Sequence, residues 1–347
     1  MRIAIVSDYA GLSGGISVFL ANLTIQLGDK IHFTLVCWGR PGYCSGEVTQ
    51  PDIQIDVIEV RNGDFQAAAA TIGQNDLVFL QTSWNVRLLA LMASEVCLAL
   101  GVPLVAAAHT TSHSAPSSAA RPLQESWLAR IFARSKCVIC VSDEVRRSIE
   151  RLGPVPRLEV IANASRYRLS DRSERTAPEN PGTFTWIGRP SPSKGAQDFF
   201  AIARDLEHTG SRFVCNGLYP DILALAGDAP ANVEFCHSLD RKAMLDLFCR
   251  SQAVVATYRH SEGLPLALLE ALSLGVPVLG YASPGVTSLL ESHGQFLAEV
   301  DDYRAIVQRI EAWHAGGIAF SPPKAEEVPH WSSTADQYLR LFQELVQ

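Results

Sequence analysis

Short apolar segments that fit β-strands alternate with helical segments along most of the chain, and this alternation limits the fold more than any other feature. In the first half we predict strands at 3–6, 33–37, 53–60, 77–80, 104–108, 137–141 and 157–161, and helices at 15–27, 86–100 and 144–152. Apolar strands between helices are typical of a parallel sheet that is covered on both faces. The sequence therefore predicts an α/β fold.

A polar segment interrupts the alternation, and a second series of elements follows it. We predict strands at 183–187, 212–215, 233–235, 253–256 and 278–280, and helices at 196–208, 241–249 and 265–274. The restart predicts an N-terminal domain at 1–164, a linker at 165–182 and a C-terminal domain at 183–328. An amphipathic helix within 329–347 is expected to pack back on the N-terminal domain.

Composition and charge narrow the class of protein. The formal net charge of −7 over 347 residues is unusual for a general nucleic-acid-binding protein, so we expect no nucleic-acid partner. The N-terminal segment is predicted to be a strand and not a signal peptide, and the apolar segment 88–108 is interrupted by Glu95 and a Gly-Val-Pro break. We expect a cytoplasmic protein without a membrane-spanning helix.

The eight cysteines include one C-x-x-C pair, Cys137 and Cys140. A zinc site would need a second pair of ligands, and none is apparent, so we interpret the two cysteines as core residues with free thiols. Free thiols suit a reducing compartment. We predict neither a metal nor a cofactor.

Two glutamates eight positions apart, Glu262 and Glu270, mark the most informative segment, S-E-G-L-P-L-A-L-L-E-A-L. Pro265 fits the first turn of a helix, whose N–H groups suit a phosphate. Glu270 lies among leucines and alanines on a helix that is apolar all round, so its carboxylate should be buried with a partner. Ligand hydroxyls and an arginine are the two candidate partners.

Two cations follow the predicted strand at 183–187, namely Arg189 and Lys194. They could be ordinary solvated loop charges. At the carboxyl end of a strand they could also form an anion site that stabilises a leaving group.

These motifs together resemble the retaining GT-B glycosyltransferases of family 4 (glycosyl transferases group 1). The E-x7-E segment is similar to that family's motif, and T-W-I-G-R-P-S-P-S-K-G at 185–195 resembles its "GR…KG" loop. In the N-terminal half the similarity rests on Gly14, Gly15, His109 and the Val-Ser at 141–142. The resemblance implies the GT-B architecture: two facing Rossmann-like domains with a deep interdomain cleft that holds the donor.

The resemblance also implies roles for the matching residues. Glu270 would bind the ribose hydroxyls, and Glu262 would bind the donor sugar near its anomeric centre. The residues given catalytic roles are Glu262, His109, Arg189 and Lys194, of which the two cations would neutralise the diphosphate. The remaining donor-binding residues are Gly14, Gly15, Gly263, Leu264 and Leu266. Pro265 stands where many relatives have glycine, so one backbone donor is missing there.

The function predicted from this resemblance is a retaining, metal-independent glycosyltransferase of the hexosyltransferase type. It would move a sugar from a nucleotide-diphosphate donor, with UDP favoured, to a hydroxyl of a saccharide, lipid-linked or small-molecule acceptor in glycan biosynthesis. A nucleotide-sugar epimerase on a GT-B-like scaffold is the alternative, and an inactive binding module is a third hypothesis. The presence of both glutamates and both cations argues against the inactive module.

Several features have a plainer interpretation beside the functional one. His109 could be a structural residue at a strand end, although its position favours the sugar contact. The glycines at 11–15 do not form the G-x-G-x-x-G pattern of dinucleotide binding. The basic segment 121–157 could make a weak peripheral contact with the inner face of a membrane, but interleaved acids favour a solvated helix face.

Overall fold

The structure, a computed structural model of the whole chain, contains two compact units. It describes residues 1–7, 15–38, 55–60, 65–83, 88–111, 121–172, 182–188, 192–217, 227, 229–237 and 239–347. Unit 1 comprises residues 1–163 together with 331–347, and unit 2 comprises residues 164–330. The chain therefore leaves unit 1, forms unit 2 and returns to unit 1 for its last helix.

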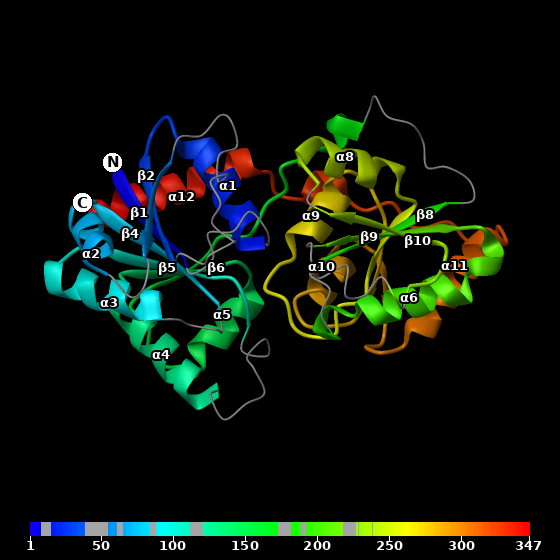
Figure 1. Cartoon of the computed structure of the whole chain (residues 1–347), viewed down its shortest axis with the longest axis horizontal. Coiled ribbons are helices and arrows are strands. Elements are labelled where there is room, and N and C mark those ends of the chain that lie inside the picture. Colours follow the sequence, from blue (N-terminus) through cyan, green and yellow to red (C-terminus); the bar gives the residue numbers. More distant parts are fainter. Residues whose placement is uncertain are drawn as a thin grey trace. The chain divides into compact units, whose positions relative to one another are not determined.

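Unit 1 is a seven-stranded parallel sheet with helices on both faces (Figure 1). Its strands are β1 (Arg2–Ser7), β2 (His32–Trp38), β3 (Asp56–Val60), β4 (Leu77–Thr82), β5 (Leu104–Ala108), β6 (Cys137–Cys140) and β7 (Leu158–Val160). Its helices are α1 (Gly15–Leu27), α2 (Gln66–Gly73), α3 (Leu88–Leu100), α4 (Arg121–Arg134), α5 (Asp143–Glu150) and α12 (Trp331–Val346). The strand order β3-β2-β1-β4-β5-β6-β7 reverses between β1 and β4. In such a sheet the reversal is where ligands bind, beyond the carboxyl ends of the strands.

Unit 2 repeats the plan with a six-stranded parallel sheet in the order β10-β9-β8-β11-β12-β13. Its strands are β8 (Thr183–Ile187), β9 (Arg212–Gly217), β10 (Val233–His237), β11 (Ala253–Ala256), β12 (Val278–Tyr281) and β13 (Phe296–Ala298). Its α-helices are α6 (Ala196–Asp205), α8 (Arg241–Arg250), α9 (Leu266–Ser273), α10 (Thr287–Ser292) and α11 (Tyr303–His314). Short 3₁₀ turns occupy Leu169–Arg172, Pro192–Lys194, Glu207–Thr209 and Ala325–Glu327. Here the order reverses between β8 and β11.

The last helix, α12, completes the core of unit 1. Figure 1 shows α12, in red, lying beside α1. Its aromatic residues meet Phe19 of α1 and Phe79 of β4: the ring centres of Phe19 and Trp331 are 5.3 Å apart, and those of Phe79 and Phe342 are 5.1 Å apart. Tyr338 contacts both phenylalanines and is completely buried. Edge-to-face aromatic pairs stabilise a fold beyond the effect of the apolar area they bury. The helix α12 is therefore a structural part of unit 1.

Some details differ from the sequence-based expectations. The helix expected at 196–208 ends at Asp205, and a 3₁₀ turn with a left-handed Gly210 follows. Residues 165–172, expected as the start of a linker, pack within unit 2. Tyr167 is only 1% exposed, and its hydroxyl donates to the carbonyl of Arg241 at 2.7 Å. The segment was interpreted as a linker because its composition is polar, but its one aromatic residue, Tyr167, is buried in unit 2. Pro265 is the N-cap of α9 and lies one residue before the helix.

Candidate functional site

The reversal point of the unit 2 sheet carries an ion pair between two of the predicted site residues. Lys194 follows β8 and Glu262 follows β11, and these two strands are neighbours. Lys194 Nζ lies 2.6 Å from Glu262 Oε1, with the two side chains 21% and 16% exposed. Lys194 Nζ also lies 4.3 Å from the ring centre of Tyr258. A cation and a carboxylate are therefore held together, still reachable, where this class of sheet binds ligands.

The loop that carries Lys194 is tied to β11 and the segment after it. The carbonyl of Ser193 accepts hydrogen bonds from Arg259 N and from His260 Nδ1, each at 2.9 Å. Gly195 has φ +68°, and a Cβ there would lie 1.9 Å from the carbonyl oxygen of Thr257. Only glycine permits both this backbone conformation and this close approach. The position of Lys194 is thus fixed by backbone contacts on both sides of it.

The backbone of Glu262 is held by the loop that follows β12. Glu262 N donates to the carbonyl of Pro284 at 3.0 Å. Gly285 has φ +79°, and a Cβ on it would lie 1.9 Å from the carbonyl oxygen of Glu262. On the other side, His260 Nε2 is 3.7 Å from Glu262 Oε1. Glu262 is therefore a preorganised carboxylate.

Glu270, on α9, is buried and pairs with an arginine. The residue is 5% exposed, and its Oε1 lies 2.8 Å from Arg166 Nε. The two opposite charges form a buried ion pair. Burial raises the pKa of Glu270, while the charges of Arg166 and Arg241 oppose that rise. Of the two partners considered for Glu270, the arginine is present in the protein itself.

Sequence reasoning missed this arginine because it lies in the segment interpreted as a linker. The burial of Glu270 demanded a partner, but composition did not indicate which of the many arginines would supply it. Sequence reasoning also missed a hydrogen-bonded group around Asp198 on α6. The Asp198 carboxylate accepts from Arg259 Nη2 at 2.6 Å and from the Tyr281 hydroxyl at 2.9 Å. No sequence signal connects these three residues, which come from separate elements.

In unit 1, His109 lies directly after β5, next to the reversal point. It is 9% exposed, and its Nε2 lies 2.9 Å from Oε1 of Gln81, at the end of β4. Burial lowers the pKa of His109 to about 4, and the ring is neutral near pH 7. Phe19 meets the ring edge-on at 4.8 Å between centres.

The other predicted donor-binding residues are placed as follows. Gly15 is the first residue of α1, with no atom within 4 Å of a Cβ built on it. Leu266 opens α9, in the turn whose N–H groups have no acceptor inside the helix. Gly263 and Leu264 lie between Glu262 and α9, and both take part in contacts. Gly14 and Arg189 lie outside the described residues.

Two alternatives raised by the sequence can be examined in the described part of the chain. No group of three or more His, Cys, Asp or Glu residues that could hold a metal ion occurs there. Cys137 and Cys140 are fully buried, and burial raises the pKa of each thiol to about 12. No helix in the described ranges combines the length and apolar content that a membrane span needs.

Most arginines of the basic segment form ion pairs with neighbouring acidic residues. Arg130 and Arg134 of α4 both pair with Glu95 of α3, and Arg146 of α5 pairs with Asp143 and Glu150. Paired surface charges are the arrangement expected of a solvated helix face. The contact with a membrane stays a prediction.

The structure resembles GT-B glycosyltransferases over its whole length. Sucrose-phosphate synthase from Thermosynechococcus elongatus matches with a TM-score of 0.76 and 16% identity, covering 99% of each chain. HepE from Anabaena, solved with UDP and glucose, matches with a TM-score of 0.76 and 15% identity, covering 99% of this chain and 100% of that one. At this identity the likeness establishes the fold: two doubly wound units of the GT-B class, one six-stranded and one seven-stranded.

Sequence comparison then gives the family. The family model described as Glycosyltransferase Family 4 matches residues 13–165, and the one described as Glycosyl transferases group 1 matches residues 168–321. The chain belongs to the family 4, group 1 glycosyltransferases. WcaL of Escherichia coli (strain K12), whose name assigns it to colanic acid biosynthesis as a glycosyltransferase, is 25% identical over 207 residues. That match covers 53% of this chain and about half, 49%, of the length of WcaL.

Proposed function

We propose that the protein is a glycosyltransferase that moves a sugar from a nucleotide-diphosphate donor, with UDP as the nucleotide, to an acceptor hydroxyl. The observation that carries this proposal is the Lys194–Glu262 pair at the reversal point of the unit 2 sheet. Ligand-free, the two charges neutralise each other. A diphosphate would take Lys194 as its counter-ion, and Glu262 would then be available to accept from sugar hydroxyls.

The nucleotide assignment has support from the neighbours. HepE has been solved with UDP-glucose and with UDP and glucose. In this chain Glu270 would accept from the ribose hydroxyls while keeping Arg166 as its counter-ion, which leaves the carboxylate ionised for that role. The Leu266 N–H and, outside the described residues, Arg189 are proposed to bind the phosphates beside Lys194. His109 is proposed to contact the transferred sugar as a neutral ring.

We further propose that transfer retains the anomeric configuration and needs no metal. An inverting enzyme needs a general base on the face of the sugar opposite to the leaving group. In a retaining reaction the departing phosphate can itself take the acceptor proton. Protein cations such as Lys194 would carry the charge that a metal ion would otherwise neutralise. The acceptor would be a saccharide, a lipid-linked sugar or a small molecule, and all cysteines that the structure describes are free thiols, which suits a reducing cytoplasm.

The test is a product assay with α-linked UDP-sugars and a panel of acceptors, in the presence of EDTA. We expect release of UDP that depends on acceptor, and an α-linked product in the proton spectrum recorded before mutarotation. A β-linked product contradicts retention, and activity that is lost in EDTA and restored by Mg²⁺ or Mn²⁺ contradicts metal independence. A changed sugar configuration without UDP release, seen with donor alone, would support the epimerase instead.

A further inference from the structure

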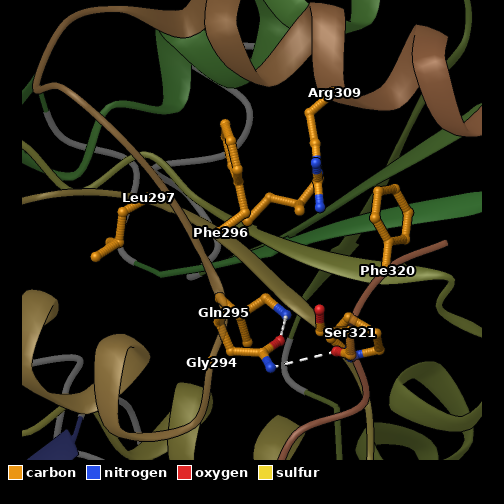
Figure 2. A pocket seen from close by; sticks show the side chains of 10 residues that line it. Gly294, Gln295, Phe296, Leu297, Arg309, Phe320 and Ser321 are labelled. Atoms are coloured by element: carbon orange, nitrogen blue, oxygen red, sulfur yellow. Dashed lines mark hydrogen bonds between the residues drawn. The ribbon is translucent and has the colours of Figure 1, made fainter. Parts of the chain in front are cut away.

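Unit 2 contains a cavity at the opposite end of its sheet from Lys194 and Glu262. The cavity measures about 210 Å³ and lies at the amino ends of β12 and β13, under α11 (Figure 2). Its side-chain walls include Phe296, Phe320, Gln295, Ser321 and Arg309. All strands of the sheet are parallel, so this cavity and the candidate donor site are separated by the length of the strands.

Arg309 is the unusual member of this wall. Figure 2 shows its side chain extending from α11 toward the cavity beside Phe296 and Phe320. In the described ranges it has no carboxylate partner, and its Nε is buried without a hydrogen-bond acceptor. Buried N–H donors are nearly always satisfied, and a guanidinium keeps its charge, so an unsatisfied one next to a cavity requires an explanation.

The contact with Phe296 satisfies only part of the guanidinium. Arg309 Cζ lies 5.2 Å from the centre of that ring, a cation–π contact that uses the face of the guanidinium plane. The N–H donors lie within the plane. Nε is enclosed by the protein, so an acceptor in the cavity would meet the two terminal nitrogens, whose N–H groups form a fork that matches a carboxylate or phosphate in a two-point contact. In the described part of the chain these terminal groups have no ion-pair partner. The fork is therefore unused.

Gln295, another polar residue of the wall, already has its hydrogen bonds within the protein. Gln295 Oε1 accepts from Val278 N at 2.9 Å, and its amide nitrogen donates to the carbonyls of His293 and Ser321 at 2.8 and 3.3 Å. These bonds fix the rim of the cavity and leave the Arg309 guanidinium as its charged donor, beside the exposed hydroxyl of Ser321. The remaining wall is largely apolar, and Phe320 is supported from behind by stacking on Trp313 at 5.5 Å.

We propose that this cavity binds a small organic anion, whose carboxylate or phosphate group is gripped by the Arg309 fork and whose apolar part packs against Phe296 and Phe320. The cavity is smaller than the roughly 300–1,000 Å³ of sites for drug-sized ligands, so the ligand has few heavy atoms beyond its charged group. This binding site is separate from the donor site and does not depend on the proposed transferase activity.

The test is a titration of the ¹⁵N-labelled full chain, followed through the amide signals of Gly294, Gln295 and Ser321 at the rim of the cavity. The probes are benzoate and phenyl phosphate, with benzamide as the uncharged analogue of benzoate. We expect saturable shifts at these amides with an anion and not with benzamide. The comparison of the two anions shows which charged group the site takes.

Substitutions of Arg309 distinguish the contribution of its guanidinium geometry to anion binding from the contribution of its positive charge. Arg309→Met keeps an unbranched side chain on Phe296 and should weaken anion binding about tenfold or more, since a hydrogen bond to a charged group is worth roughly 1.5–3 kcal/mol. Arg309→Lys keeps the positive charge but loses the fork, so its anion affinity should lie between those of the wild type and of Arg309→Met. Arg304→Met, an exposed change on the same helix, and Lys194→Met, at the donor site, should leave binding unchanged.

The proposal fails if the rim amides show no saturable shift with either anion. It also fails if benzamide gives the same shifts as benzoate, or if binding persists undiminished in folded Arg309→Met and Arg309→Lys proteins. A loss of anion binding in Lys194→Met alone would assign the anion to the donor site and overturn the proposal as well.

Discussion

Glu270 is a buried charge that has a partner inside the protein and, in the proposed function, a second one in the ligand. Glu270→Gln should weaken UDP binding about ten- to a hundredfold, because the ribose loses a charged acceptor. It should also lower the melting temperature, because Arg166 loses its counter-ion. Calorimetry and thermal unfolding measure the two effects.

Arg166→Gln is the matched control for this prediction. It breaks the same ion pair from the other side but leaves the Glu270 carboxyl group in place. In a titration at a pH high enough to keep that carboxyl group ionised without its counter-ion, stability should fall while UDP affinity changes much less. If both variants lose stability and neither loses UDP affinity, Glu270 serves the fold alone and its proposed contact with ribose is wrong.

His109 should make the stability of unit 1 depend on pH. The folded protein holds the ring neutral, with its pKa lowered to about 4, whereas an unfolded chain protonates histidine near pH 6.5. This contribution to stability is complete above pH 6.5, is lost progressively as pH falls below 6.5, and is gone once pH has fallen through about 4. Between pH 7 and pH 5 the free energy of unfolding should therefore fall by roughly 2 kcal/mol from this group alone.

Urea unfolding of His109→Gln at the two pH values checks this sign and size. The variant should lose less stability than the wild type on going from pH 7 to pH 5. An unchanged pH dependence in His109→Gln would mean that the ring is not held neutral.

The loop that follows β12 holds the backbone of Glu262 in place through contacts with Pro284 and Gly285. Gly285→Ala combines a left-handed backbone with a Cβ 1.9 Å from the carbonyl oxygen of Glu262, so the loop or Glu262 must move. We expect a loss of stability clearly greater than the roughly 1–2 kcal/mol of left-handed strain alone, together with weaker donor binding. Thermal unfolding and UDP titration are the measurements.

Gly316→Ala gives the matched comparison for Gly285→Ala. Gly316 has φ +69° but no atom within 4 Å of a built Cβ, so only the conformational strain applies. Equal losses of stability in the two variants would show that the loop can move the added Cβ of residue 285 away from the Glu262 carbonyl at no cost in free energy. A larger loss in Gly285→Ala with unchanged donor binding would separate the loop from the site.

The elements were predictable because strands buried on both faces are short and uniformly apolar. Both parallel sheets are confirmed, and β13, α2, α4, α10 and α11 were not anticipated. Lys194 and Glu262 could be assigned to strand ends from the sequence. Their ion pair depends on β8 and β11 being neighbours, which is a property of strand order and not of either segment. The same limit applies to Asp198 and Arg259, whose contact joins a helix to a distant loop.

At the scale of the whole molecule, the core of unit 1 depends on a helix that comes after all of unit 2. Phe342→Ala should destabilise unit 1 by roughly 3–5 kcal/mol, the usual cost of removing a buried ring, because Phe79 loses its partner. Gln343→Ala, at the neighbouring exposed position, should cost little. Hydrogen exchange should show faster opening in β1, β4 and α1, with the strands of unit 2 unaffected.

If Phe342→Ala instead accelerates exchange equally in both sheets, the two units unfold as one cooperative body. If it leaves the exchange of β4 unchanged, α12 contributes nothing to the unit 1 core.

The return of the chain to unit 1 has a consequence for its synthesis. About 180 residues separate Asn163 from the end of α12, and at translation rates of about 5–20 residues per second their addition takes roughly 10–40 s. Throughout that time a nascent chain carries all the strands of unit 1 without the helix that covers Phe19 and Phe79, whereas unit 2 emerges as one uninterrupted segment. The half of the protein that is made first is thus completed last, and its aromatic surface stays uncovered until the rest of the chain has been made.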